Sequence, residues 1–174
     1  MDSTPTEKCK FVHNVIIEYN NLADSIPNNA LLVIQETIRE IVQLISKLNS
    51  VKAEDTGYEV IFDEKDRIFH TKVESIREYE DIDNLCEELL QSFKNYVEHA
   101  SSEEPISNFS LIKVAVINET LKELTTLMRF IKMAKKDISI EEMLEIKKDI
   151  FMVTYEKFFK GFFPLIIALS TYSS

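Results

Sequence analysis

The sequence contains very little glycine and proline. Only two glycines and four prolines occur in 174 residues, so few positions suit the positive φ angles that tight hairpins and phosphate-binding loops require. This scarcity argues against β-sandwiches, β-barrels and nucleotide-binding folds. Leu, Ile, Glu and Lys are common instead, and most apolar residues recur at helical spacing. The sequence therefore predicts an all-α fold.

Cysteine is also scarce, and long apolar runs are missing. Cys9 and Cys86 are far apart, and neither has a second Cys or a His at a zinc-binding spacing, so we predict neither a disulfide framework nor a structural metal site. The longest apolar run, residues 161–169, is too short to span a bilayer. Residues 1–10 lack the apolar core of a secretion signal. We expect an intracellular protein, cytoplasmic or nuclear, without a transmembrane segment.

The whole chain has a formal net charge of −10. Its negative charge is concentrated in the middle third. Residues 53–104 carry 16 acidic and 5 basic residues, whereas residues 105–174 carry 8 acidic and 10 basic residues. An acidic surface repels polyanions and attracts basic partners. We therefore expect no binding of nucleic acid, and we expect a protein partner with a basic surface.

Three segments have apolar residues at alternating intervals of three and four, which is typical of amphipathic helices. The first covers residues 12–26 and should end at Pro27, whose ring cannot continue the hydrogen-bond ladder. The second covers residues 31–48, with Asn28 and Asn29 as candidate N-caps. The third covers residues 111–131 and is predicted to be almost fully buried.

The acidic segment between these helices has two interpretations. Its apolar pattern resumes at Phe62 and continues to about residue 100 without an intervening Gly or Pro. This pattern fits one long helix, or two helices that meet at the cluster Glu80, Asp81 and Asp83, where short carboxylates can cap a new start. We favour a bend or a short break at that cluster.

A capping box marks the start of the last helix. In the sequence Ser-Ile-Glu-Glu, residues 139–142, the Ser139 hydroxyl is placed to accept a hydrogen bond from the N–H of Glu142. Ile138 and Met143 occupy the positions of a hydrophobic staple. We therefore predict a helix that begins at 139–140, and the apolar spacing continues it to about residue 162.

Together these segments predict one helical bundle of five to six antiparallel amphipathic helices over residues 7–174, preceded by a disordered N-terminus at residues 1–6. A chain of this length can bury one sizeable core. The hydrophobic fraction of 45% is that of an ordinary globular protein.

Few residues could support catalysis. The three histidines fall on different predicted helices, and none follows a Glu at the spacing of a di-iron bundle. No phosphate-binding loop, nucleophile elbow or zincin helix is present. Carboxylates cluster at residues 87–88, at Glu119 and Glu123, and at residues 141–145, and we predict that these clusters face solvent. We expect no enzymatic activity, cofactor or metal; an enzyme with a carboxylate-bound metal is an alternative.

The C-terminal segment contains more aromatic residues than one helical stripe can bury. Phe158, Phe159, Phe162 and Phe163 fall within six positions. The bundle core, a partner or dimer interface, and a lipid surface could each cover them.

Our first hypothesis is a non-enzymatic adaptor that binds another protein, with a homodimer as a further candidate assembly. The second is a bundle that binds a small apolar ligand or lipid in a cavity lined by the C-terminal phenylalanines. The candidate partner-binding residues are acidic or aromatic: Glu80, Asp81, Asp83, Glu87, Glu88, Phe158, Phe159, Phe162 and Phe163.

Overall fold

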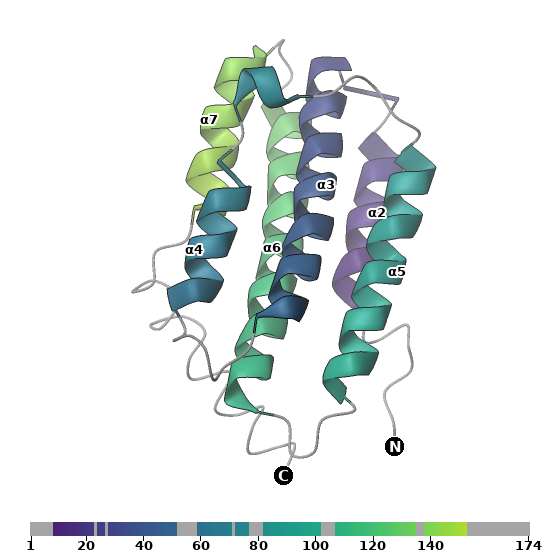
Figure 1. Ribbon diagram of the computed structural model, residues 1–174. Coiled ribbons are helices and arrows are strands. Elements are labelled where there is room, and N and C mark those ends of the chain that lie inside the picture. Colours follow the sequence, from purple (N-terminus) through teal and green to yellow (C-terminus); the bar gives the residue numbers. More distant parts are fainter. Residues whose placement is uncertain are drawn as a thin grey trace.

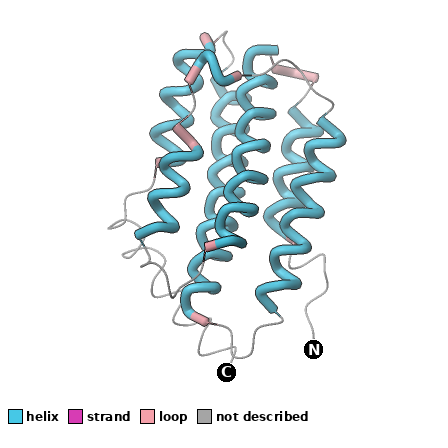
Figure 2. The backbone as a smooth tube through the Cα atoms, in the orientation of Figure 1, coloured by secondary structure: helices cyan, strands magenta, loops and turns pink. Residues whose placement is uncertain are grey.

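The computed structural model describes residues 9–22, 24–26, 28–51, 59–70, 72–76, 82–101, 107–134 and 138–152. These ranges contain six α-helices, one short 3₁₀ helix and no strand (Figure 2). The elements are α2 (Lys10–Leu22), α3 (Asn28–Ser50), α4 (Glu59–Ile68), η2 (Val73–Ser75), α5 (Ile82–Ser101), α6 (Asn108–Ala134) and α7 (Ile140–Phe151). The prediction of an all-α bundle is confirmed.

The helices form three layers of two (Figure 1). α3 and α6 lie in the middle, α4 and α7 on one side, and α2 and α5 on the other. Helices that follow one another in the sequence run in opposite directions, whereas the neighbours α2 and α6 run in the same direction (Figure 1). Two contacts fix this parallel pairing, because Lys122 lies over the Phe11 ring and Arg129, seven residues later, approaches Glu18.

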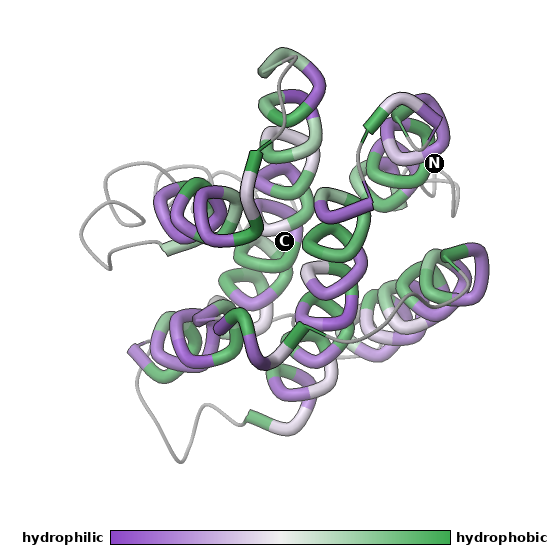
Figure 3. Tube along the Cα trace, turned by 90° about the horizontal axis from the view of Figure 1, so that it is seen from above, coloured by the Kyte–Doolittle hydropathy of each residue, from purple (hydrophilic) through white to green (hydrophobic). Residues whose placement is uncertain are grey.

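The two central helices supply most of the core. α3 contacts α4, α5, α6 and α7, and its apolar stripe is buried throughout: Ile34, Ile38, Ile41, Ile45 and Leu48. α6 buries a similar stripe that includes Ile117, Leu121, Leu124 and Met128. Viewed along the bundle, hydrophobic and hydrophilic residues alternate along each helix, as amphipathic helices require (Figure 3).

The first helix ends earlier than predicted. α2 stops at Leu22, where the Ser25 backbone N–H and the Ser25 hydroxyl both donate to the Leu22 carbonyl at 2.9 Å. These bonds close a turn that replaces the helical ladder, so Pro27 is not the residue that ends α2. α3 then begins at Asn28 itself, so Asn28 and Asn29 are helical residues and not the caps that we predicted.

Residues 62–100 form two helices, as favoured, but the break between them is longer than predicted. α4 ends at Ile68 and α5 begins at Ile82, with η2 between them. The Phe69 side chain is buried just after α4 and stacks on Phe151 of α7 with ring centroids 5.1 Å apart. This contact directs the chain toward α7 and away from the line of a continuous helix.

The capping box is confirmed as the start of α7. Ser139 is extended, and its hydroxyl accepts a hydrogen bond from the backbone N–H of Glu142 at 3.1 Å. Both staple residues, Ile138 and Met143, are buried. α7 itself ends at Phe151, because Met152 leaves the helical conformation, so this helix does not continue to residue 162 as we predicted. Residues 153–174, which contain the aromatic C-terminal segment, and residues 1–6, which we predicted to be disordered, lie outside the described residues. The predictions for these two segments stay predictions.

Candidate functional site

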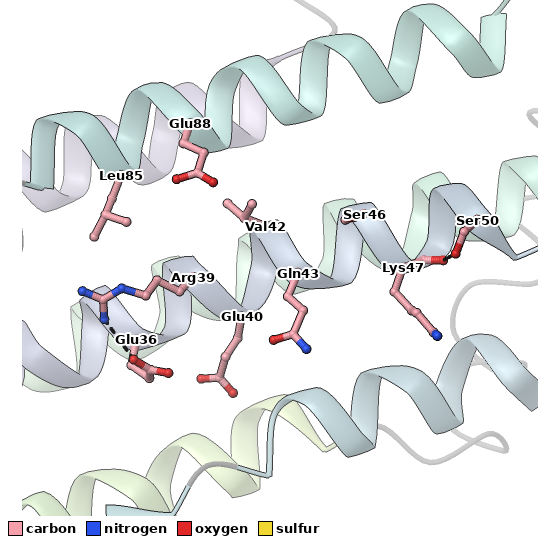
Figure 4. A pocket seen from close by; sticks show the side chains of 10 residues that line it. All are labelled: Glu36, Arg39, Glu40, Val42, Gln43, Ser46, Lys47, Ser50, Leu85 and Glu88. Carbon is pink, nitrogen blue, oxygen red and sulfur yellow. Dashed lines mark hydrogen bonds and ion pairs between the residues drawn. The ribbon is translucent and has the colours of Figure 1, made fainter. Parts of the chain in front are cut away.

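A groove of about 580 Å³ runs along the outer face of α3 with α5 at its edge (Figure 4). Leu85 and Glu88 point from α5 toward α3, and Val42 points from α3 toward α5. The groove is lined by ten residues: Glu36, Arg39, Glu40, Val42, Gln43, Ser46, Lys47, Ser50, Leu85 and Glu88. Eight of these come from α3, so the geometry of that helix fixes the shape of the site.

The α3 sequence places this groove on the side opposite its apolar stripe. Polar residues recur at intervals of three and four from Glu36 to Ser50, and the apolar stripe from Ile34 to Leu48 has the same spacing on the other side of the helix. At its C-terminal end, α3 meets α6, where the Lys113 ammonium donates to the carbonyls of Leu48 and Val51. The groove therefore opens away from α6.

The two deepest carboxylates of the groove take part in ion pairs. Arg39 Nη1 donates to Glu36 Oε2 at 2.9 Å, and both side chains are nearly nine-tenths buried. Glu40 is 5% exposed and accepts a hydrogen bond from Lys147 of α7. Val42, half-buried, and Leu85, buried, provide apolar surface between α3 and α5. The groove thus combines apolar surface with two carboxylates held in ion pairs, and the exposed Lys47 and Glu88 also line it.

The exposed face of α5 is acidic. Its exposed side chains include four carboxylates, those of Asp83, Glu87, Glu88 and Glu98, and its one lysine, Lys94, is half-buried. Asp83 lies in the first turn of α5, where a negative charge is stabilised by the helix dipole. We call these four residues the α5 acidic face; Glu88 also lines the groove.

Of the nine residues predicted to contact a partner, the structure describes three. Asp83, Glu87 and Glu88 lie together on exposed positions of α5. The other six fall outside the described residues: Glu80, Asp81, Phe158, Phe159, Phe162 and Phe163. Three of the five acidic residues thus lie on α5 at the edge of the groove, and a contact of any of the nine residues with a partner stays a prediction.

Two buried ion pairs were missed by our reading of the sequence. Lys65 Nζ of α4 donates to both carboxylate oxygens of Glu123 in α6, at 3.0 and 2.9 Å, and Lys147 of α7 pairs with Glu40 of α3. We predicted that Glu123 faces solvent, and this prediction is wrong, because Glu123 is 7% exposed. The signal was present in the sequence, since Lys65 occupies a stripe position between buried Ile61 and Ile68.

Burial dominates the electrostatics of these lysines. It lowers the pKa of Lys65 and of Lys147 below the ordinary lysine value of 10.5, because a buried ammonium loses its hydration. Glu123 and Glu40 act in the opposite direction by attracting the charged form. Lys147 Nζ also lies 5.8 Å from the centroid of the Phe69 ring. Each pair holds an outer helix against a central one, which is a structural role.

Other candidate reactive groups are scattered or shielded. His70 is exposed just after α4, His99 is exposed on α5, and His13 is half-buried on α2. Cys9 and Cys86 are buried and form no disulfide, and burial raises the pKa of Cys86 to about 11. Among the described residues, no three His, Cys, Asp or Glu side chains are grouped closely enough to hold a metal ion.

Within the described ranges, no helix is both long enough and apolar enough to cross a membrane. Comparisons with protein-family models, with curated proteins and with solved structures gave no significant match to this chain.

Proposed function

We propose that this chain is a non-enzymatic interaction module that binds a basic segment of another protein along α5 and the neighbouring groove. One observation carries the proposal: the α5 acidic face presents four exposed carboxylates directly beside a groove that contains apolar surface. Like charges on one face raise the rate of encounter with a partner of opposite charge.

The groove supports a particular kind of partner, an amphipathic helix with lysine or arginine along one side. The alkyl stems of such residues can lie on Val42 and Leu85 while their charged ends reach Glu88 and its neighbours. Glu36 and Glu40 already pair within the chain. These two carboxylates are also buried, so we assign the attraction for the partner to the exposed carboxylates of α5.

A binding role accounts better than catalysis for how the groove uses its charged groups. The buried carboxylates Glu36 and Glu40 are held by Arg39 and Lys147. A carboxylate that acted as a general base would instead have to lie within hydrogen-bond reach of a substrate. These ion pairs support a rigid docking surface.

The proposal is tested with a synthetic helical peptide that has leucine on one face and lysine on the other. The variant Asp83→Asn, Glu87→Gln, Glu88→Gln removes three charges from α5. Because an exposed ion pair contributes about 0.2–1 kcal/mol, the three changes should weaken peptide binding roughly tenfold. The affinity of the unaltered chain should also fall as ionic strength rises.

A matched control removes the same three charges from another surface. Glu141→Gln, Glu145→Gln, Asp149→Asn changes one first-turn acid and two further exposed acids of α7, so it has the same net charge as the α5 variant. Binding should change by less than about twofold in this control. Equal loss in both variants would mean that net charge alone drives binding. No loss in the α5 variant would place the partner elsewhere.

A further inference from the structure

Two large apolar side chains are exposed close together near the C-terminal end of α6. Phe130 is 47% exposed and Met133 is 77% exposed, and residues three apart on a helix are neighbours on its surface. Arg129 and Lys132 are exposed beside them. We call Arg129, Phe130, Lys132 and Met133 the α6 strip; it contains two cations and two apolar residues, and Glu18 of α2 lies beside Arg129.

Single exposed apolar residues are ordinary, whereas apolar residues that adjoin one another on a surface can mark an interaction site. Exposed apolar side chains that adjoin arginine are typical of protein interfaces, where Phe, Met and Arg are enriched. The other exposed large apolar residues that the structure describes, Ile17 and Val73, have no such flanking pair of exposed cations.

The strip and the groove are complementary in chemistry. The strip offers Lys132 together with Arg129, whose guanidinium also lies 3.7 Å from Glu18 of α2, and the α5 acidic face offers carboxylates. The strip offers Phe130 and Met133, and the groove contains Val42 and Leu85. The groove also lies next to the acidic face, since Glu88 belongs to both. A surface that presents the α6 strip therefore meets the requirements of the proposed partner.

The two surfaces lie on opposite faces of the bundle, so one molecule cannot join its own strip to its own groove. The groove opens on the side of α3 that points away from α6. The strip lies on the side of α6 that points away from the core, because Leu127, Met128 and Ile131 on the same turns are buried. In Figure 1, α6 lies behind α3.

We infer that the α6 strip of one molecule docks into the α3–α5 groove of a second copy of this chain. The charge complementarity between the two faces selects this occupant. The contact is head-to-tail, with different surfaces on the two copies, so it produces chains or rings and not a closed two-fold dimer. The inference rests on the proposed function, since it names a partner for the same groove.

Sedimentation velocity over a concentration series at low salt tests the inference. The strip variant is Phe130→Ser, Met133→Ser; the groove variant is Asp83→Asn, Glu87→Gln, Glu88→Gln; and the control is Ile17→Ser, which changes an exposed apolar residue on α2. The unaltered chain and the control should form larger species as concentration rises. Each of the other variants alone should stay monomeric, with an unchanged helical circular dichroism spectrum.

Mixing the two variants gives the decisive result. The strip variant keeps a working groove and the groove variant keeps a working strip, so an equimolar mixture should form a one-to-one dimer and nothing larger. An unaltered chain that stays monomeric at every concentration overturns the inference. Self-association that the strip variant retains also overturns the inference. A mixture of the two variants that fails to associate overturns it as well, because that result indicates a two-fold contact.

Two further measurements separate this inference from the proposed function and from a lipid role. If the chain does not self-associate but the strip variant still binds the lysine peptide, the inference fails and the proposed function stands. If the groove variant binds that peptide with unchanged affinity, the proposed function fails. The unaltered chain could instead remain monomeric and bind phosphatidylserine vesicles, with only the strip variant losing that binding. This result would assign the strip to a lipid surface and overturn the inference.

Discussion

The two outer layers of the bundle are attached to its central helices by different interactions. On the α2 and α5 side, the buried contacts come from apolar, aromatic and cysteine side chains: Val12, Val15, Tyr19, Leu22, Leu85, Cys86, Leu89, Phe93 and Tyr96. On the α4 and α7 side, each helix also buries a lysine, Lys65 or Lys147, paired with a glutamate of a central helix.

This difference teaches how each layer is positioned. Apolar burial is favourable but non-directional, so it tolerates small changes in the placement of a helix. A buried ion pair is directional, because a shift of either helix would separate the charges and leave them desolvated. We therefore expect the pairs to fix where α4 and α7 sit along α6 and α3, with less benefit to overall stability than their contacts suggest.

The largest expected effect comes from breaking one pair. Lys65→Met leaves the Glu123 carboxylate buried without its partner and should lower the free energy of unfolding by about 3–5 kcal/mol. Leu89→Met, a swap of similar volume in the apolar layer, should cost less than about 1.5 kcal/mol. Urea denaturation measures both.

The double variant Lys65→Met, Glu123→Leu completes this test. Replacing a buried pair by apolar residues of similar volume is often neutral or stabilising, so the double variant should recover most of the loss. If Lys65→Met costs no more than Leu89→Met, the ionic layer is no more specific than the apolar one, and the comparison fails.

The sequence predicted the helices and the core because those depend on local spacing. The stripe of α3 and the cap at Ser139 could both be recognised within a few residues. The pairing of Lys65 with Glu123 could not, because these residues are 58 positions apart and only the tertiary packing brings them together. A lysine at a stripe position indicates that some partner is needed, but it does not identify that partner.

The same limit applies to the groove. The sequence predicted an acidic segment, and Glu87 and Glu88 were among its candidate residues. It could not predict that α3 would run beside α5 and add Glu36, Val42 and Gln43 to the site, because parallel helices that are not consecutive leave no local pattern. The end of α2 was mispredicted for a local reason, since Ser25 closes a turn before Pro27 is reached.

A smaller effect is expected from pH. The pKa of Lys65 and of Lys147 is lower in the folded chain than the ordinary value of 10.5, so between the two values the unfolded chain binds more protons. Their contribution to stability is therefore fully present above pH 10.5 and is lost as pH falls through the folded pKa. The slope is at most about 1.4 kcal/mol per pH unit for each lysine.

The measurement compares urea denaturation of the unaltered chain and of Lys65→Met, Glu123→Leu between neutral pH and about pH 10.5. The unaltered chain should gain stability relative to the double variant as pH rises. A relative loss over this range would mean that Glu123 raises the pKa of Lys65 by more than burial lowers it, and the assigned direction would be wrong.

The smallest effect concerns the cap of α7. It tests whether the start of that helix depends on the ion pair between Lys147 and Glu40. Ser139→Ala leaves the N–H of Glu142 without its acceptor and should lower the free energy of unfolding by about 1 kcal/mol, whereas Ser139→Gly should cost only a few tenths. Lys147 lies eight residues further on, about 12 Å along the helix axis. In the double variant Ser139→Ala, Lys147→Met the two losses should add to within about 0.5 kcal/mol, because the sites share no partner. A combined loss well below that sum would show that α7 shifts along α3 once its pair with Glu40 is broken, so that Ser139 no longer caps it.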